Sequence, residues 1–166
     1  MRGNSPANHP DQVVQGGFAM SRAVRYSNTM TKIAIIEDDA IISQMYRMKF
    51  EAEGFSVQTA DTGDTGLSLL KDFRPDIVLL DLQLPVHNGD HVLATLRNQS
   101  WGKSIPVLIL TNFSEQEAPS SLQKLDVAGY IIKANFTPKQ VVAFVHNVLG
   151  DQTDATTSKP SPEQPE

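Results

Sequence analysis

The sequence predicts an α/β domain built on a five-stranded, parallel, doubly wound sheet of strand order 2-1-3-4-5. Five short runs rich in Ile, Val and Leu alternate along the chain with stretches whose apolar residues recur every three or four positions. Such runs suit strands that are buried on both faces, and right-handed crossovers then lay helices on both sides of the sheet. Five units are too few for a closed eight-stranded barrel, so an open sheet is expected.

The predicted strands and helices alternate regularly. The strands are expected at residues 32–36, 55–59, 76–80, 105–110 and 130–132. The helical patterns lie within residues 41–52, 67–70, 92–96, 118–125 and 141–149. Thr137 followed by Pro138 is a typical helix start, and Gly54 and Gly150 are typical residues just beyond a helix end.

Three zones divide the chain. Residues 31–150 carry the periodic patterns and are expected to form one domain. Residues 1–30 are polar and aperiodic, and residues 151–166 are rich in Pro, Ser, Thr and Glu, so both are expected to be disordered. Met20 and Met30 lie inside this leader, and our hypothesis is that translation starts at one of them.

Composition excludes several classes of protein. The net charge of −5 argues against a broad nucleic-acid surface and against a polybasic membrane anchor. The chain has no cysteine, so neither a disulfide framework nor a thiolate metal site can form. No apolar run approaches the roughly 20 residues that span a bilayer, and no secretory signal is apparent. We therefore expect a cytoplasmic protein without nucleic-acid or membrane partners.

Acidic residues follow the first and third predicted strands. Glu37, Asp38 and Asp39 come after the first, and Asp81 comes after the third. In a sheet of this order the carboxyl ends of these two strands border one crevice, where ligands bind. Carboxylates about 4 Å apart repel by roughly 4 kcal/mol, so the cluster must hold protons or a cation such as Mg²⁺. The alternative is that Glu37, Asp38 and Asp39 only cap the following helix, and Asp39 fits such a cap even if its neighbours bind metal.

A hydroxyl and an ammonium are expected at the same edge of the sheet. Thr111 follows the fourth predicted strand, and Lys133 follows the fifth. Each alone is a common residue at a strand end. Together with the acids they indicate a site in which Lys133 neutralises Asp81 at rest and then binds a phosphoryl oxygen.

Four stretches carry a resemblance to a known family. They are IAIIEDD (33–39), DIVLLDLQLPVHNG (76–89), PVLILT (106–111) and GYIIK (129–133). Over residues 31–150 the chain resembles response-regulator receiver domains of two-component signalling, of the stand-alone kind found in chemotaxis regulators, and such domains have a flavodoxin-like sheet. The Leu84-Pro85 and Gly89 positions match the loop that leads into the third helix of these domains.

The resemblance implies a role for each residue at the sheet edge. Asp81 is implied to be the phosphoacceptor. Glu37 and Asp38 are implied to hold Mg²⁺, with Asp38 favoured as the direct ligand and Gln83 supplying a backbone carbonyl. Thr111 is implied to bind the phosphoryl group through its hydroxyl.

Two further roles and the partners also follow from the resemblance. Lys133 is implied to pair with the phosphoryl group. Tyr130 is implied to change rotamer when Thr111 moves toward the phosphoryl group. The donor is expected to be a sensor histidine kinase or a histidine phosphotransfer protein. The readout face is expected on the fourth helix, fifth strand and fifth helix, and the output is expected to be a protein target or onward relay.

Two residues depart from the pattern of the family. Ala134 stands where a proline joined through a cis bond is usual, and we expect a trans bond and a rerouted loop there. Asn112 stands where a smaller residue is common, and it is expected to narrow access to Asp81 and slow hydrolysis. These departures keep open a phosphorylation-independent pseudo-receiver that acts only by binding partners.

An enzyme is the other alternative. Phosphatases of the haloacid-dehalogenase kind use an aspartyl nucleophile with a second Asp two residues later, where this chain has Gln83. The chain is therefore expected to be a phosphoacceptor with self-catalysed transfer and hydrolysis rather than an enzyme. His87 and His91 lie four residues apart and could share a metal, but without a third ligand motif they are expected to be solvated.

Overall fold

The computed structural model describes residues 29–150. Its strands are β1 (Lys32–Ile36), β2 (Ser56–Ala60), β3 (Ile77–Leu80), β4 (Val107–Thr111) and β5 (Gly129–Ile132). Its α-helices are α1 (Ala40–Ala52), α2 (Gly63–Phe73), α3 (Gly89–Asn98) and α4 (Pro138–Leu149). Two short 3₁₀ helices, η1 (Ser120–Lys124) and η2 (Lys133–Asn135), complete the described part. The expectations for disordered residues at both ends fall outside the described residues, apart from Thr29 and Met30.

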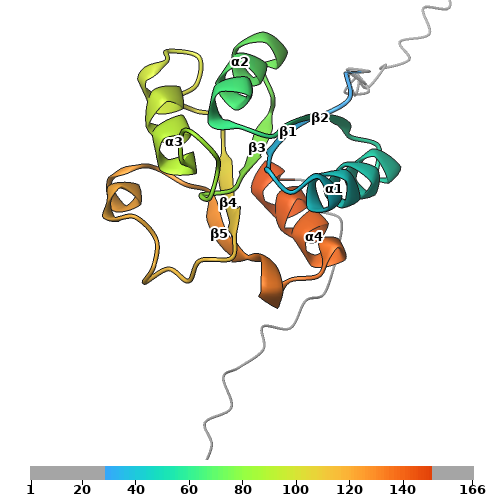
Figure 1. Ribbon diagram of the computed structural model, residues 1–166. Helices are drawn as coiled ribbons and strands as arrows, with labels where there is room; N and C mark the ends of the chain where they lie inside the picture. The colour runs from blue at the N-terminus through green and yellow to red at the C-terminus, as the bar shows by residue number, and fades with distance from the viewer. Residues whose placement is uncertain (1–28, 151–166) are drawn as a thin grey trace, which may run out of the picture.

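The five strands form one parallel sheet in the order β2-β1-β3-β4-β5, which confirms the predicted fold. Helices α1 and α4 cover one face of the sheet, and α2 and α3 cover the other (Figure 1). None of the helices in residues 29–150 has the length and hydrophobicity that a membrane-spanning helix needs.

The core consists of two apolar layers, one on each face of the sheet. Successive residues of β1 alternate between them: Ile33 and Ile35 join the layer under α1 and α4, whereas Ala34 and Ile36 join the layer under α2 and α3. This alternation follows from the two-residue repeat of a strand. Because both faces are covered, the strands are nearly continuous apolar runs, as the sequence predicted.

Local capping sets the ends of the helices. Asp39 caps α1, because its side chain accepts hydrogen bonds from the backbone N–H groups of Ile41 and Ile42. Thr137 caps α4 in a capping box, with Pro138 at the first helical position as predicted. Gly54 and Gly150 follow α1 and α4 with φ angles of 90° and 76°, the left-handed region that glycine tolerates best.

The predicted helix over residues 118–125 is wrong as an α-helix. The connection from β4 to β5 contains only the 3₁₀ helix η1, which follows Pro119. Pro119 stands just before η1, where a proline costs no helical hydrogen bond, so it does not by itself block an α-helix; the stretch lacks a continuous buried face that would stabilise one. Leu122 alone is buried in this stretch. The expected readout face therefore has no α-helix between β4 and β5.

The connection after β5 follows the expectation for Ala134. No cis peptide bond occurs in residues 29–150, and the chain turns through η2 before α4 begins. The route beyond Lys133 is thus a short 3₁₀ turn that leads into the Thr137 cap.

Candidate phosphoacceptor and metal site

Strand pairing brings the acidic residues to one edge of the sheet. The register pairs Ile36 of β1 with Leu80 of β3, so Glu37 and Asp81 leave neighbouring strands at the same level. The N–H of Asp81 donates to the carbonyl of Ile36 over 3.0 Å, which continues the ladder by one residue. Adjacent strands therefore place the two carboxylates side by side, as expected for a switch in strand order.

Three carboxylates converge at this edge. Glu37, Asp38 and Asp81 each offer an oxygen, and these oxygens all lie within 4.8 Å of one another. Glu37 and Asp81 are buried, whereas Asp38 is exposed. In residues 29–150 this is the one group of three His or carboxylate side chains close enough to share a metal ion.

Lys133 supplies the positive charge of the site. Its Nζ lies 2.8 Å from Oδ2 of Asp81 and also forms an ion pair with Oε2 of Glu37. All three side chains are less than a tenth exposed, so the pairing takes place largely away from water. One ammonium therefore serves two carboxylates, which leaves the site with a net negative charge.

Burial and pairing change the titration of these groups. Burial raises the pKa of Glu37 above its ordinary 4.5, although hydrogen bonds from Lys133 and from the backbone N–H of Asp39 act in the opposite direction. Burial acts to lower the pKa of Lys133, but its hydrogen bonds to Asp81 and Glu37 outweigh burial and raise that pKa above 10.5. Lys133 is thus held in its charged form at neutral pH.

The acidic run after β1 divides between two roles. The Asp39 carboxylate is committed to the N-terminus of α1 and is absent from the convergent group. Glu37 and Asp38 point into that group, where the N–H of Asp39 supports Glu37 through a 3.1 Å hydrogen bond to its Oε1. Both alternatives from the sequence are therefore realised, each by different residues of the run.

Thr111 lies at the end of β4 and is fully buried. Since the sheet order is β3-β4-β5, Thr111 stands on the strand between those that lead to Asp81 and Lys133. The Tyr130 hydroxyl donates to the carbonyl of Phe113 over 3.0 Å and reaches that of Ser114 at 3.4 Å. The phenol thereby ties β5 to the connection that follows Thr111.

The loop from β3 to α3 is tightly built around Asp81. The N–H of Gln83 donates to Oδ1 of Asp81 over 3.1 Å, which orients the carboxylate. A Cβ on Gly89 would lie 2.1 Å from the carbonyl oxygen of Asp81, so only glycine fits at that position. Val86 has a φ angle of 67°, an unfavourable conformation for a β-branched residue and one that concentrates near functional sites.

A cleft of about 500 Å³ opens beside Asp38 and Gln83. Phe113 and Glu117, from the connection after β4, line its other side. The sequence analysis missed both residues because it expected a regular helix nearby. The sequence carried no periodic signal for these two residues, since they lie before the predicted helical stretch.

The two remaining sequence hypotheses concern histidine and asparagine. The rings of His87 and His91 stack with centroids 4.6 Å apart, and Nε2 of His87 lies 3.5 Å from Oδ1 of Asp64. His91 is exposed and His87 half-buried, and neither belongs to the convergent group. Asn112 is exposed next to Thr111, and its effect on hydrolysis stays a prediction.

Residues 33–146 match the family described as the response regulator receiver domain, which covers more than half of the chain. The chain belongs to this family. Receiver domains are signalling proteins of two-component phosphorelays, in which they accept a phosphoryl group on an aspartate and bind magnesium. They interact with histidine kinases or phosphotransfer proteins.

Curated relatives of this receiver are longer proteins. The cell cycle transcriptional regulator CtrA of Caulobacter vibrioides is 33% identical over 118 residues, which are 71% of this chain and 50% of CtrA. The DNA-binding response regulator MtrA of Mycobacterium tuberculosis is 33% identical over 123 residues, 74% of this chain and 52% of MtrA. The chain thus spans about half the length of the curated relatives that it matches.

Solved structures agree with the fold of this receiver. The chemotaxis response regulator CheY4 of Vibrio cholerae is 28% identical with a TM-score of 0.67, and the match covers 72% of this chain and 99% of CheY4. The receiver domain of the sensor histidine kinase PA1611 of Pseudomonas aeruginosa is 20% identical, with a TM-score of 0.67 and coverage of 74% and 99%. Its structure holds a magnesium ion coordinated in the active-site cleft.

The donor set in this receiver fits a magnesium ion. Mg²⁺ prefers hard oxygen ligands, binds through one or two carboxylates, and keeps several of its waters. Glu37, Asp38 and Asp81 provide carboxylate oxygens within reach of one another, and the exposed Asp38 leaves room for water and substrate. In residues 29–150 no cysteine is present that would favour a softer metal.

Proposed function

We propose that Asp81 accepts a phosphoryl group from the phosphohistidine of a sensor histidine kinase or a histidine phosphotransfer protein. One observation carries this proposal: the buried Asp81 carboxylate lies 2.8 Å from the Lys133 ammonium and within metal-sharing distance of Glu37 and Asp38. A purely structural buried ion pair has no need of two further carboxylates around one ammonium, because the surplus negative charge is unfavourable.

The proposed chemistry is a displacement at phosphorus. An oxygen of the Asp81 carboxylate attacks, the bond from phosphorus to the histidine nitrogen breaks, and the imidazole leaves with the electron pair of that bond. The product is an acyl phosphate on Asp81. Later, water attacks the phosphorus, which restores the carboxylate and releases inorganic phosphate.

The residues around Asp81 act mainly by position and charge. The N–H of Gln83 holds one carboxylate oxygen, and the Lys133 ammonium meets the other and then pairs with a phosphoryl oxygen. The hydroxyl of Thr111 binds the phosphoryl group. A magnesium ion held by Glu37, Asp38, Asp81 and the backbone carbonyl of Gln83 would offset the negative charge that accumulates during transfer.

The output is proposed to be a change in protein–protein interaction, with Tyr130 and Thr111 as the switch. The hydrogen bond from the Tyr130 hydroxyl to the Phe113 carbonyl couples β5 to the connection after Thr111. A shift of Thr111 toward the phosphoryl group would therefore disturb that connection. A receiver that acts in the cytoplasm, on a protein target or by onward relay of the phosphoryl group, completes the proposal. Because MtrA is named a DNA-binding response regulator, nucleic-acid binding has to be tested separately.

The pseudo-receiver stays the alternative. Ala134 and Asn112 are the features that favour it, since they directly follow Lys133 and Thr111 and depart from the pattern of the family. An aspartyl phosphatase is less well supported, because Gln83 offers no second carboxylate and the chain is a receiver.

The deciding experiment incubates the protein with acetyl phosphate and MgCl₂ and measures its intact mass. One phosphoryl adduct is expected in the native chain and none in Asp81→Asn. Asp39→Asn is the matched control, because Asp39 is an acid at the same edge of the sheet but its carboxylate caps α1. This variant should keep the adduct.

Other results would redirect the proposal. An adduct that persists in Asp81→Asn would assign the acceptor elsewhere. No adduct with acetyl phosphate, phosphoramidate or a phosphorylated histidine kinase would favour the pseudo-receiver. A pull-down with and without beryllofluoride, a mimic of the phosphoryl group, then identifies a target whose binding depends on the switch.

A further inference from the structure

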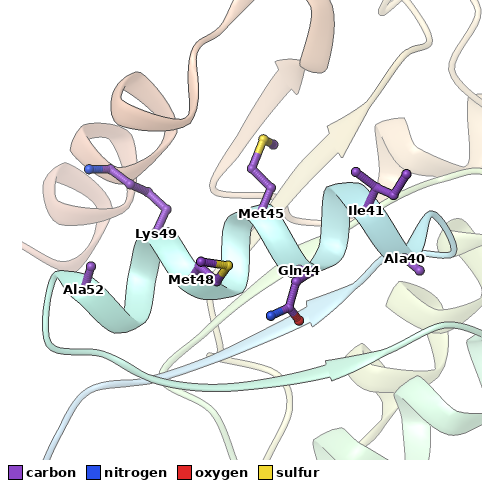
Figure 2. Close-up of a pocket in the computed structure, with 7 residues that line it drawn as sticks. All are labelled: Ala40, Ile41, Gln44, Met45, Met48, Lys49 and Ala52. Carbon is purple, nitrogen blue, oxygen red and sulfur yellow. The ribbon is translucent and has the colours of Figure 1, made fainter.

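Two features of the surface lie outside the phosphoacceptor site. One is an apolar stripe on α1, and Figure 2 shows the exposed side chains of Ile41, Met45 and Met48 along this helix. These aliphatic and thioether groups offer a partner little besides apolar contact. The other feature is the pair His87 and His91, whose imidazole nitrogens can bind a metal ion through defined atoms.

The fold brings an acid from another element to this histidine pair. Nε2 of His87 lies 3.5 Å from Oδ1 of Asp64, which stands in the first turn of α2. His87 belongs to the loop between β3 and α3, so the contact joins two elements that are distant in the sequence. The histidines alone lacked a third ligand, and the tertiary structure supplies a carboxylate for that role.

The separation of His87 and Asp64 suits a single zinc ion. Zn²⁺ binds imidazole nitrogen and carboxylate oxygen at about 2.0–2.2 Å, usually in tetrahedral geometry. Two donor atoms 3.5 Å apart, each about 2.05 Å from one ion, subtend an angle of roughly 117° at it. This angle is close to the tetrahedral value of about 110°, so the two side chains need little movement to share an ion.

His91 is placed to become the third ligand. Its ring stacks on that of His87, with centroids 4.6 Å apart and an angle of 29° between the planes. Two imidazolium rings would repel each other in this arrangement, so it suits neutral rings, the form that binds metal ions. Because His91 lies beside His87 rather than Asp64, its exposed side chain has to rotate to reach the ion. Water would take the fourth position.

The backbone beneath the first two ligands is closely packed. A Cβ on Gly63 would lie 2.6 Å from the carbonyl oxygen of His87 and 2.8 Å from its Cβ, so the start of α2 packs directly on the loop. Asp64 is the next residue along α2. The side chains of Asp64 and His87 are 66% and 42% exposed, so an ion reaches them from solvent without opening the domain.

We propose that His87, His91 and Asp64 form a zinc site, separate from the magnesium site at Asp81. The donor atoms distinguish the two ions. Imidazole nitrogen suits Zn²⁺ and other transition metals, whereas Mg²⁺ selects oxygen ligands. A site with three protein ligands and one water is an arrangement that zinc commonly adopts.

Zinc at this position would link α2 to the loop between β3 and α3. That loop also carries Gln83, whose N–H holds the Asp81 carboxylate, and Gly89, which lies against the Asp81 carbonyl. Bound zinc would therefore restrict the motion of a segment that positions Asp81. An effect on phosphoryl transfer rests on the proposed function, but the binding of zinc does not.

Nuclear magnetic resonance of the imidazole nitrogens tests the site in the native chain. The full chain is prepared with ¹⁵N-labelled histidine and kept in excess MgCl₂, which occupies the acidic site. One equivalent of ZnCl₂ should shift the ring nitrogens of His87 and His91 together. The other two histidines, His9 and His146, serve as internal controls and should not shift. This measurement needs no variant, so it does not depend on the folding of a mutant.

Calorimetric titration with ZnCl₂ in the same buffer measures the share of each ligand. His87→Asn, His91→Asn and Asp64→Asn should each weaken zinc binding by about tenfold or more, since loss even of a group that only supports a zinc ligand costs that much. The matched control is Asp72→Asn, because Asp72 is another exposed acid of α2, and it should leave the zinc affinity unchanged.

Three outcomes would overturn the proposal. Unshifted rings of His87 and His91 at millimolar zinc would show that the pair binds no ion. Equal zinc affinities of Asp64→Asn and Asp72→Asn would remove the carboxylate from the site. Zinc binding that is lost in Asp38→Ala but kept in His91→Asn would assign the ion to the acidic site. None of these measurements involves phosphorylation, so a failure here is distinguishable from a failure of Asp81 as acceptor.

Discussion

The Nζ atom of Lys133 lies 2.8 Å from Oδ2 of Asp81, although β4 separates the two strands that these residues follow. The lysine side chain thus crosses the end of one strand to reach the carboxylate. The same Nζ also forms an ion pair with Glu37, which follows β1 on the far side of β3, so a single buried ammonium holds two carboxylates together. The stability of the protein and the affinity of this site for cations both depend on this arrangement.

Replacing Lys133 with methionine should destabilise the protein by about 3 kcal/mol in urea unfolding without magnesium, because two buried carboxylates lose their counter-charge. Added MgCl₂ should recover part of the loss, since a divalent cation can take over that role. Lys139→Met on the exposed side of α4 is the control and should change stability by less than about 0.5 kcal/mol. Equal stability of the native chain and Lys133→Met would contradict the proposed electrostatics.

The neighbours Asp38 and Asp39 should separate metal binding from helix capping. Asp38→Ala removes a carboxylate of the convergent group and should weaken magnesium binding by about 1.4 kcal/mol or more, which is roughly tenfold. Asp39→Ala removes the cap of α1 and should cost about 1 kcal/mol of stability with little change in magnesium affinity. Calorimetric titration and urea unfolding measure the two effects. If both variants lost magnesium affinity equally, Asp39 would also have to be a ligand.

Gly89→Ala should displace the backbone of Asp81. The added Cβ would lie 2.1 Å from the carbonyl oxygen of Asp81, so the loop must move, at a cost of about 3 kcal/mol. Gly54→Ala is the comparison: its φ angle of 90° costs about 1 kcal/mol, but nothing lies within 4 Å of the new atom. Only the Gly89 variant should also weaken magnesium binding. A mild effect at Gly89 would mean that the loop adapts without moving the carboxylate.

Tyr130→Phe should loosen the connection between β4 and β5. Loss of the hydroxyl bond to Phe113 should cost about 1 kcal/mol and speed amide hydrogen exchange in residues 113–128. Unchanged exchange in those residues would rule out the coupling that we propose for the switch.

The contribution of the Tyr130 phenol should depend on pH. Burial raises its pKa above the ordinary 10.0, and the nearby acids Glu115, Glu117 and Asp81 add to this. A raised pKa means that the fold favours the neutral phenol. Its stabilisation is therefore complete below pH 10 and is lost as the pH rises through the folded-state pKa. The stability difference between the native chain and Tyr130→Phe should shrink over that alkaline range, and ultraviolet titration of the phenol locates it.

The strand order and the positions of the site residues could be predicted from sequence for one physical reason. Apolar runs of β length, alternating with helical periodicity, allow few topologies, since parallel strands need right-handed crossovers. Once the order is known, the residues after β1, β3, β4 and β5 must meet at one edge. This rule places Glu37, Asp81, Thr111 and Lys133 together at that edge without any knowledge of their contacts.

The connection from β4 to β5 could not be predicted in the same way. Ala118, Leu122 and Leu125 have helical spacing, but of these three only Leu122 is buried, so the stretch has too little apolar packing to stabilise an α-helix. Apolar spacing predicts which side chains are buried, but it does not determine whether the backbone forms an α-helix or a 3₁₀ turn. The short 3₁₀ turn, and the cleft lined by Phe113 and Glu117, therefore appear only in the folded chain.

The sequence by itself determined the order of elements and the set of charged groups at the rim, because both follow from local periodicity and strand ends. Only the tertiary structure decided how those groups divide their roles. Distances between side chains assigned Asp39 to the helix cap, Asp38 to the convergent group, and Lys133 to two carboxylates at once. The exposure of Ile41, Met45 and Met48 likewise could not be predicted from the sequence, since their helical spacing is equally consistent with a face that packs on the sheet.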